Sequence, residues 1–228
     1  MIKIKENAIF IADSHYNDKT KHLLLSLLKE ILNDRIECSQ LILMGDIFDF
    51  LAVEIMYFQN INHEAINLIN EISYIKQVVY LEGNHDFNLK KLFPNSFVIP
   101  RDIQPIQATL NSQTLKLSHG DIYIPFFYNL YTSIIRNHFV LKFLNFIDFN
   151  YWLTYKISQN LMKKDICKPQ KDFDQFVEKR IKIYKTDLVI EGHFHQGYLS
   201  KNYINIPSLC CNKQYMVFKE NQFTFHNL

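Results

Sequence analysis

Five short apolar runs along this chain each end in a cluster of glycine, aspartate, asparagine or histidine residues. The central run, Leu41–Met44, delivers Asp46 into a turn directly after Gly45. The other four runs end in Asp13-Ser14-His15, Gly83-Asn84-His85-Asp86, His119-Gly120-Asp121 and Gly192-His193-Phe194-His195. Buried parallel strands present side chains in this way at their carboxyl ends. The pattern predicts an α/β fold whose strand ends gather metal-binding side chains.

Two amphipathic segments connect the first three of these runs. Residues 21–33 carry leucine and isoleucine at helical spacing and lead into the Asp46 run, and residues 61–75 repeat the pattern before residues 78–81. These β-α-β units predict a parallel sheet. Short β-like runs separated by turn residues predict hairpins and a second sheet. They lie at Phe97–Leu117, Tyr203–Ile206, Gln214–Phe218 and Phe223–Phe225.

Length, composition and charge predict a globular protein in the cytoplasm. A chain of 228 residues with 48% hydrophobic residues suits one domain over residues 1–228, and a net charge of +2 does not favour a nucleic-acid partner. Asp13 and His15 lie too near the start for a cleavable signal peptide to precede them, and the longest apolar runs are too short to span a membrane.

The cysteines favour a reducing compartment. The chain has four of them, and no pair shows C-x-x-C spacing. The adjacent Cys210 and Cys211 are poorly placed for a zinc site or an ordinary disulfide framework. The sequence therefore predicts a reducing cytosol.

The candidate ligands outnumber what one metal ion needs. Seven oxygen and nitrogen donors follow the apolar runs: Asp13, His15, Asp46, Asn84, His119, His193 and His195. If Asp46 bridges two cations, each cation receives four protein ligands and keeps open positions for water and phosphate oxygens. Two carboxylates against two divalent ions leave a charge near +2, which attracts a phosphoester. Imidazole and carboxylate ligands suit Mn²⁺, Fe²⁺ or Zn²⁺.

The set D-x-H, G-D-x-x-D, G-N-H-D, H-G-D and G-H-x-H resembles the calcineurin-like metallophosphoesterases. The resemblance implies a fold of two packed mixed β-sheets flanked by helices (αββα) and a site with two divalent metal ions, for which we expect Mn²⁺ first. It also implies that Asp13, His15, Asp46 and His195 hold one metal, and that Asp46, Asn84, His119 and His193 hold the other. His85 then resembles the general acid or transition-state donor, oriented by the carboxylate of Asp49.

Each of these residues also has a structural interpretation. A single histidine or aspartate after a strand is more often a cap or turn residue than a ligand, but the five motifs together are highly specific. Asp86 and Asp121 are expected to brace loops. A protein that binds metal for stability without catalysis is the alternative from another class, and the complete ligand set argues against it.

The position and size of the segment at about 122–170 resemble the helical lid of bacterial UDP-2,3-diacylglucosamine hydrolases. This resemblance implies cleavage of UDP-2,3-diacylglucosamine to UMP and 2,3-diacylglucosamine 1-phosphate in lipid A synthesis. Histidine at position 85, where the best-known branch of that group has G-N-R-D, keeps open a phosphodiesterase or nuclease of the same family. Phe50 follows Asp49, so the D-R-G sequence typical of protein serine/threonine phosphatases is missing.

The same segment is basic and aromatic. Residues 122–168 hold six basic and two acidic side chains, a net +4 in a chain whose total is +2. One interpretation is that its aromatic residues pack on the core. The other is that this segment binds a nucleotide-linked lipid substrate and makes peripheral contact with the inner membrane, because basic and aromatic side chains suit anionic lipid. The aromatic residues are Phe126, Phe127, Tyr128, Tyr131, Phe139, Phe143, Phe146, Phe149, Tyr151, Trp152 and Tyr155.

Overall fold

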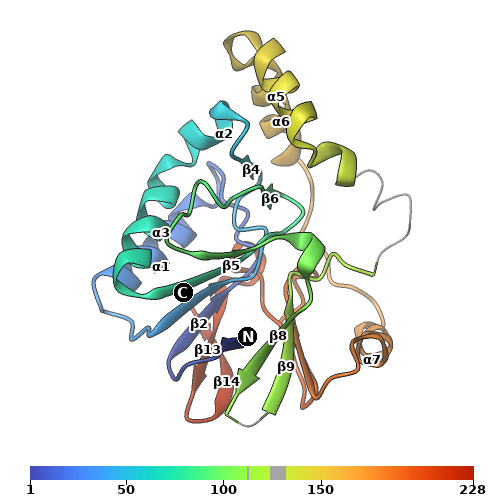
Figure 1. Cartoon of the computed structure of the whole chain (residues 1–228). Coiled ribbons are helices and arrows are strands. Elements are labelled where there is room, and N and C mark those ends of the chain that lie inside the picture. Colours follow the sequence, from blue (N-terminus) through green and yellow to red (C-terminus); the bar gives the residue numbers. More distant parts are fainter. Residues whose placement is uncertain (112, 124–131) are drawn as a thin grey trace.

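Two mixed β-sheets pack face to face and carry helices on their outer faces. This computed structural model describes residues 1–111, 113–123 and 132–228. Among the described residues each of the two sheets has six strands. Figure 1 shows helices α1 and α3 outside one sheet, α7 outside the other, and α5 and α6 projecting beyond the strand ends. The αββα fold predicted by the sequence is confirmed.

The first sheet has the strand order β14-β13-β2-β3-β5-β7. Strands β2, β3, β5 and β7 are parallel, and β13 runs antiparallel to β2 and pairs with β14 in a hairpin. The strands are Ala8–Ile11 (β2), Gln40–Leu43 (β3), Gln77–Leu81 (β5), Phe97–Ile99 (β7), Gln214–Lys219 (β13) and Gln222–Asn227 (β14). Helices α1 (Lys21–Leu32) and α3 (His63–Ile75) join the parallel strands, as the sequence predicts.

The second sheet has the strand order β1-β8-β9-β10-β12-β11. Its strand β10 lies parallel to both β9 and β12, and β8 forms a hairpin with β9. The strands are Ile2–Lys3 (β1), Ile106–Leu110 (β8), Gln113–Ser118 (β9), Leu188–Glu191 (β10), Tyr198–Leu199 (β11) and Tyr203–Asn205 (β12). A short 3₁₀ helix, η1 (Arg101–Ile103), links β7 to β8.

The membership of the second sheet differs from the prediction. The sequence assigned Gln214–Phe218 and Phe223–Phe225 to a second sheet, but β13 and β14 extend the first sheet through pairing with β2. Strand β7 also belongs to the first sheet. The hairpins were predicted correctly because their turns are local, whereas the partner of each hairpin is set by contacts across the whole chain.

The alternation of side chains along the central strands explains why both faces are buried. Phe10, Ile42 and Val79 point between the two sheets, where they meet Leu117 and Ile190. Their neighbours along the same strands, which include Ile9, Leu41, Val78 and Tyr80, pack against α1 and α3. Successive strand residues face opposite sides, so an unbroken apolar run fills both cores.

A small layer separates the sheets from two projecting helices. Strands β4 (Leu51–Ala52) and β6 (Asp86–Phe87) pair beyond the first sheet, and α2 (Met56–Ile61) follows β4. Helices α5 (His138–Ile147) and α6 (Trp152–Leu161), called here the lid helices, are joined by the 3₁₀ helix η2 (Phe149–Tyr151). Two helices were predicted in this segment, and Phe126, Phe127, Tyr128 and Tyr131 lie outside the described residues.

Specific contacts attach the lid helices to the body. His138 Nδ1 lies 2.6 Å from Glu54 Oε1, and Arg136 donates to the carbonyl of Gly83. Asp148, which is buried, accepts from the backbone of Leu153 at 2.7 Å and thereby caps the start of α6. None of the described helices combines the length and the apolar character that a membrane span requires.

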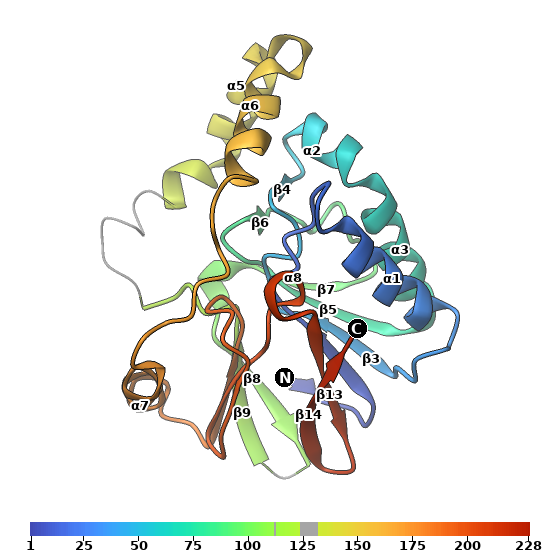
Figure 2. The ribbon, with the colours of Figure 1, turned by 180° about the vertical axis from the view of Figure 1, so that it is seen from behind.

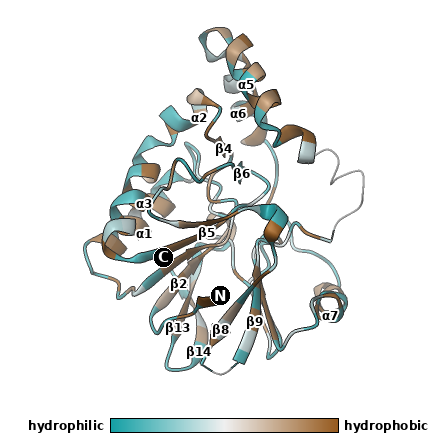
Figure 3. Cartoon of the chain, in the orientation of Figure 1, coloured by the Kyte–Doolittle hydropathy of each residue, from teal (hydrophilic) through white to brown (hydrophobic). Residues whose placement is uncertain are grey.

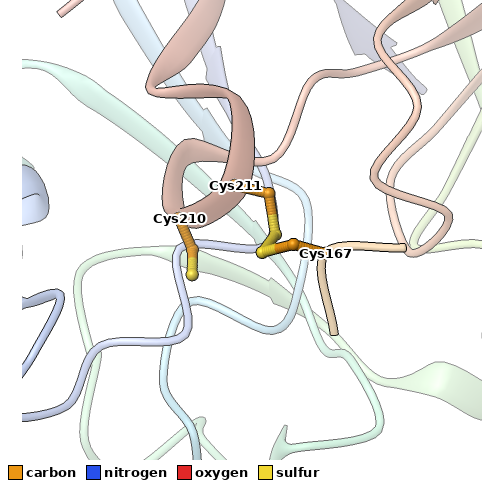
Figure 4. A group of neighbouring side chains, drawn as sticks. All are labelled: Cys167, Cys210 and Cys211. Carbon is orange, nitrogen blue, oxygen red and sulfur yellow. A yellow bond between two sulfur atoms is a disulfide. The ribbon is translucent and has the colours of Figure 1, made fainter. Parts of the chain in front are cut away.

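The expectation that the cysteines are reduced is wrong for one pair. Cys167, between α6 and α7 (Phe173–Tyr184), forms a disulfide with Cys211 on α8 (Leu209–Asn212). Figure 4 shows this bond with the free Cys210 beside it. Sequence spacing does not reveal the pair, because its members are 44 residues apart and are brought together by the packing of α8 against the end of the first sheet.

One buried ion pair attaches α7 to the strand that precedes His193. The Arg180 guanidinium donates to the Glu191 carboxylate of β10, and it also donates to the carbonyls of Gly120 and Ile122 at 3.0 and 2.9 Å. Both side chains are buried. The pair therefore positions two site loops at once, the one after β9 and the one after β10.

We expect Glu191→Ala to lower the free energy of unfolding by about 3–5 kcal/mol, because it leaves the Arg180 charge buried without its partner. Urea denaturation monitored by circular dichroism measures the change. Asp18→Ala, which breaks the exposed Lys21–Asp18 pair, is the matched control and should cost no more than about 1 kcal/mol. Equal effects of both substitutions would contradict a structural role for the buried pair.

Candidate metal centre

The backbone adopts an unusual conformation at the predicted ligands. Asp13, His15, Asp46, His193 and His195 all have positive φ, between 42° and 66°. This left-handed region is uncommon for residues other than glycine, although Asp, Asn and His visit it more often than most. Such a turn after a strand changes the direction of successive side chains, and the local strain is held in place by the surrounding sheets.

The first group of donors gathers Asp13, His15 and His195, whose ligand atoms lie within 4.8 Å of one another. His195 Nε2 is 3.3 Å from Asp13 Oδ1, although the two residues lie after strands of different sheets. The other Asp13 oxygen accepts from the backbone N–H of His193 at 2.8 Å. This group thus joins the ends of β2 and β10.

The second group gathers Asp46, His119 and His193, again within 4.8 Å of one another. His119 Nε2 is 3.5 Å from Asp46 Oδ2 and 3.1 Å from Asn84 Oδ1. The four residues follow β3, β5, β9 and β10, so both sheets contribute. The structure therefore brings together all seven donors that the sequence singled out.

The electrostatics of the site reflect carboxylates buried beside imidazoles. Burial alone would raise the pKa of Asp46, but His119 and His85 outweigh it and hold that pKa well below its usual value. The pKa of Asp13 is lowered in the same way, against burial, mainly by His195. Burial opposes the charged form of His119, yet Asp46 raises its pKa to about 10. Both carboxylates are therefore ionised at neutral pH.

The pKa values of two other imidazoles in the site are shifted in opposite directions. Burial, with His119 next to it, lowers the pKa of His193 to about 4, so this ring is neutral and free to ligate. The pKa of His15 is raised, because the hydrogen bond to Asp49 and the charge of Asp46 exceed the effect of burial.

The donor set fits two divalent cations. Asp13 Oδ1 and His15 Nε2 are buried without a hydrogen-bond partner among the described residues, as expected of atoms directed at an ion. Glycines at two positions allow the loops to lie close to the Asp46 and His119 side chains. A Cβ atom at Gly83 would lie 2.2 Å from Asp46 Oδ1, and one at Gly45, where φ is +86°, would lie 2.5 Å from His119 Nδ1.

The predicted contact between the Asp49 carboxylate and His85 is wrong. His85 Nδ1 lies 2.6 Å from the backbone carbonyl of Asp49. The Asp49 carboxylate instead lies 3.1 Å from His15 Nδ1 and accepts from Asn17 Nδ2 at 2.7 Å. It therefore orients the His15 ring so that Nε2 faces the first group of donors. The main chain orients His85 because β4 and β6 pair parallel just beyond these two residues.

Asp86 and Asp121 brace loops, as the sequence predicted. Asp86 accepts from the backbone N–H groups of Asp46, Ile47 and Gly83 at 3.0, 2.7 and 2.9 Å. Burial and the Asp46 charge raise its pKa to about 7. The Asp121 carboxylate accepts from Arg101 at 2.5 Å.

Sequence reasoning missed the main-chain groups that orient two of the candidate histidine ligands. The Met44 carbonyl lies 2.8 Å from His119 Nδ1, and the Ile166 carbonyl lies 2.9 Å from His195 Nδ1. Each contact turns Nε2 toward the donor group. Every residue type has a carbonyl, so no sequence signal could have identified these two.

This arrangement identifies the class of protein. The model of the calcineurin-like phosphoesterase family matches residues 7–197, and the chain belongs to that family. It is a metal-dependent hydrolase of phosphoesters. No curated protein matches the chain in sequence.

Several solved structures are similar to this chain. One is a point mutant of a cold-active protein tyrosine phosphatase, with 12% identity, a TM-score of 0.49, and coverage of 98% of this chain and 78% of that one. The Escherichia coli phosphoesterase YfcE has 14% identity, a TM-score of 0.48 and coverage of 96% and 91%. A dimetal phosphatase from Danio rerio has 13% identity, a TM-score of 0.47 and coverage of 96% and 95%.

We expect Asp46→Ala to lower the metal content of the purified protein and to abolish phosphodiester hydrolysis, because Asp46 belongs to the second donor group and its charge also acts on His15 of the first. Metal content is measured by atomic emission, and hydrolysis with bis-p-nitrophenyl phosphate. Asp121→Ala is the control and should mainly lower loop stability. Full activity in Asp46→Ala would remove the two-metal interpretation.

Proposed function

We propose that this protein hydrolyses a nucleotide-linked lipid, and that UDP-2,3-diacylglucosamine is the first substrate to test. The products would be UMP and 2,3-diacylglucosamine 1-phosphate. The observation that supports this proposal is an apolar cavity of about 380 Å³ between the lid helices and the body, whose lining includes Asn84 and His85 of the candidate metal centre.

The cavity lining suits an acyl chain. Phe50, Ile55 and Phe58 come from the body, and α5 and α6 contribute aliphatic side chains, including Leu144 and Ile157. Its volume falls within the range of about 300–1,000 Å³ typical of small-molecule sites. Each buried methylene contributes about 0.8 kcal/mol, so an acyl group in this cavity would hold its phosphate beside the metal centre.

The proposed roles follow the two donor groups. Asp13, His15, Asp46 and His195 would hold one cation, and Asp46, Asn84, His119 and His193 the other, with Mn²⁺ as the ion expected first. Such a pair of cations supplies an activated water and neutralises phosphoryl charge. The peptide N–H of His85 donates to Asp46 Oδ1 at 2.8 Å, which fixes the loop that carries both Asn84 and His85.

His85 is proposed as the proton donor. Burial lowers its pKa in the free protein, so the ring is largely neutral before substrate binds. An anionic phosphoryl group beside the ring would raise that pKa and favour the imidazolium, which donates to the leaving oxygen. The Asp49 carbonyl accepts from Nδ1, so Nε2 is the nitrogen left for the substrate.

We expect His85→Ala to keep both metals and to lose roughly a hundredfold to ten-thousandfold in rate, the range typical of a lost general acid or base. The loss should shrink with bis-p-nitrophenyl phosphate, whose leaving group needs no proton. His22→Ala, an exposed histidine on α1, is the matched control. Loss of metal from His85→Ala would instead make His85 a ligand.

The lid variants test the substrate. Leu144→Ser with Ile157→Ser should raise KM for UDP-2,3-diacylglucosamine at least about tenfold, because each substitution removes apolar surface from the acyl site. Hydrolysis of bis-p-nitrophenyl phosphate should stay nearly unchanged. Phe146→Ser, at a side chain 85% exposed, is the control for a lid change away from the cavity.

Equal losses on both substrates would show that the lid helices have only a structural role. Fastest turnover of single-stranded DNA would favour the nuclease alternative.

The outer surface of the lid helices supports peripheral membrane contact. Phe139, Phe143, Phe146, Phe149 and Trp152 are between 62% and 85% exposed. Figure 3 shows hydrophobic colouring along these helices, which project away from the packed sheets. Exposed lysines accompany the aromatic residues, whereas Asp148 is turned inward to cap α6. Basic and aromatic groups together bind anionic lipid surfaces.

We expect the protein to sediment with anionic liposomes at low salt and to be released as salt rises, because each basic residue contributes about 1 kcal/mol near anionic lipid. Phe146→Ser with Phe149→Ser should reduce sedimentation and leave bis-p-nitrophenyl phosphate hydrolysis intact. Tight, salt-dependent DNA binding without liposome binding would contradict the membrane proposal.

A further inference from the structure

Three cysteine sulfurs lie directly behind a ligand of the candidate metal centre. Cys167, Cys210 and Cys211 place their Sγ atoms within 4.8 Å of one another, and Figure 4 shows the bond between Cys167 and Cys211. Cys211 Sγ lies 3.6 Å from His195 Nδ1. The disulfide thus lies behind the nitrogen of His195 that does not face Asp13.

The disulfide also holds the main-chain group that orients His195. Ile166, whose carbonyl accepts from His195 Nδ1 at 2.9 Å, is the neighbour of Cys167 in the chain. Around it the chain returns from α6 toward α7, and Figure 2 shows this stretch passing beside α8. Its other described contacts include exposed hydrogen bonds with Gln196, such as the one from Gln170 N at 2.9 Å. Among its described contacts, the covalent bond to Cys211 is therefore the firmest one that holds this stretch, and with it the Ile166 carbonyl, beside His195.

We propose that Cys167–Cys211 is a reversible thiol–disulfide modification site whose state sets how firmly His195 is held for the first cation. The inference rests on the proposed assignment of His195 as a ligand of that cation. Cys167 is exposed, whereas Cys211 is half-buried, so Cys167 Sγ is the sulfur open to an external reagent. The reactant required is a dithiol of the kind that reduces protein disulfides in cells.

The exchange proceeds in two balanced steps. One thiolate of the dithiol attacks Cys167 Sγ, the bond to Cys211 breaks, and Cys211 leaves with the electron pair and takes up a proton. The second thiol of the reagent then attacks its own sulfur in the mixed disulfide, and Cys167 leaves as a thiol. Two electrons and two protons pass to the protein, and the reagent departs as a cyclic disulfide.

Cys210 does not replace the external reagent. Attack by Cys210 would only exchange one protein disulfide for another and would bring no electrons to the protein, so reduction still requires the external dithiol. The position of Cys210 beside the disulfide makes Cys210→Ser a matched control that leaves both bonded cysteines in place.

Reduction breaks the bond between Cys167 and Cys211, so the neighbouring Ile166 carbonyl is no longer held in place by it. His195 then loses the fixed acceptor for Nδ1–H, and a ligand histidine without such a partner binds metal about 10–100-fold more weakly. The two cysteines are 44 positions apart, and His193 and His195 lie in the loop between them, so reduction opens the loop that carries both histidines. The second cation, which would not use His195, should be affected less, because the contacts with Ile166 and Cys211 are made by His195.

The first experiment counts thiols in denatured protein purified without reductant. We expect two, from Cys38 and Cys210, and four after treatment with dithiothreitol. Four thiols before treatment would overturn the proposal.

The second experiment compares Mn²⁺ binding by the oxidised and the reduced wild-type protein, with the reductant removed, in equilibrium dialysis. We expect one of the two dissociation constants, that of the first cation, to rise about tenfold or more on reduction and to recover on reoxidation. Cys210→Ser should respond like the wild type. Cys167→Ser with Cys211→Ser should resemble the reduced protein and ignore the reductant. Equal Mn²⁺ affinity in both states would overturn the proposal.

His195→Ala separates this inference from the assignment on which it rests. Loss of one Mn²⁺ from that variant, together with no effect of reduction on the wild type, would overturn the redox proposal alone. Retention of both ions in His195→Ala would overturn the assignment of His195 and the redox proposal with it.

Discussion

The ionised carboxylates of Asp13 and Asp46, buried where two sheets meet, are the constraint on which the rest of the structure depends. A buried charge without partners is costly, so the surrounding loops must supply imidazoles and backbone N–H groups at short range. His193 N–H donates to Asp13 and His85 N–H donates to Asp46. Asp13 Oδ1, which has the His195 imidazole 3.3 Å away, makes no hydrogen bond among the described residues, which suits an atom that faces an ion.

The two packed sheets make this concentration of polar groups possible. Asp13 and Asp46 follow strands of one sheet, and His119, His193 and His195 follow strands of the other. The apolar core between the sheets fixes the distance between these strand ends. Left-handed turns then redirect the ligand side chains, and the packing of both sheets holds those turns in place. A single sheet would not bring donors from opposite sides together in this way.

The lid helices and the cysteine cluster extend the site in two directions. The cavity beside His85 places an apolar compartment next to the polar centre. The return from α6 toward α7 contributes the Ile166 carbonyl to His195 and the Cys167 sulfur to the disulfide. One stretch of chain therefore links the lid helices to His195.

The sequence by itself determined the fold class and the candidate donors at the strand ends, because an apolar run followed by Asp, Asn or His in a turn is a local pattern. All seven donors and the five central strands could be read in this way. Tertiary structure decided which sheet β13 and β14 join, which group the Asp49 carboxylate orients, and which cysteines bond. Strand partners and disulfides depend on contacts between distant segments, and the carbonyls that orient His85, His119 and His195 belong to the backbone. Neither kind of information is carried by the order of side chains within a short stretch.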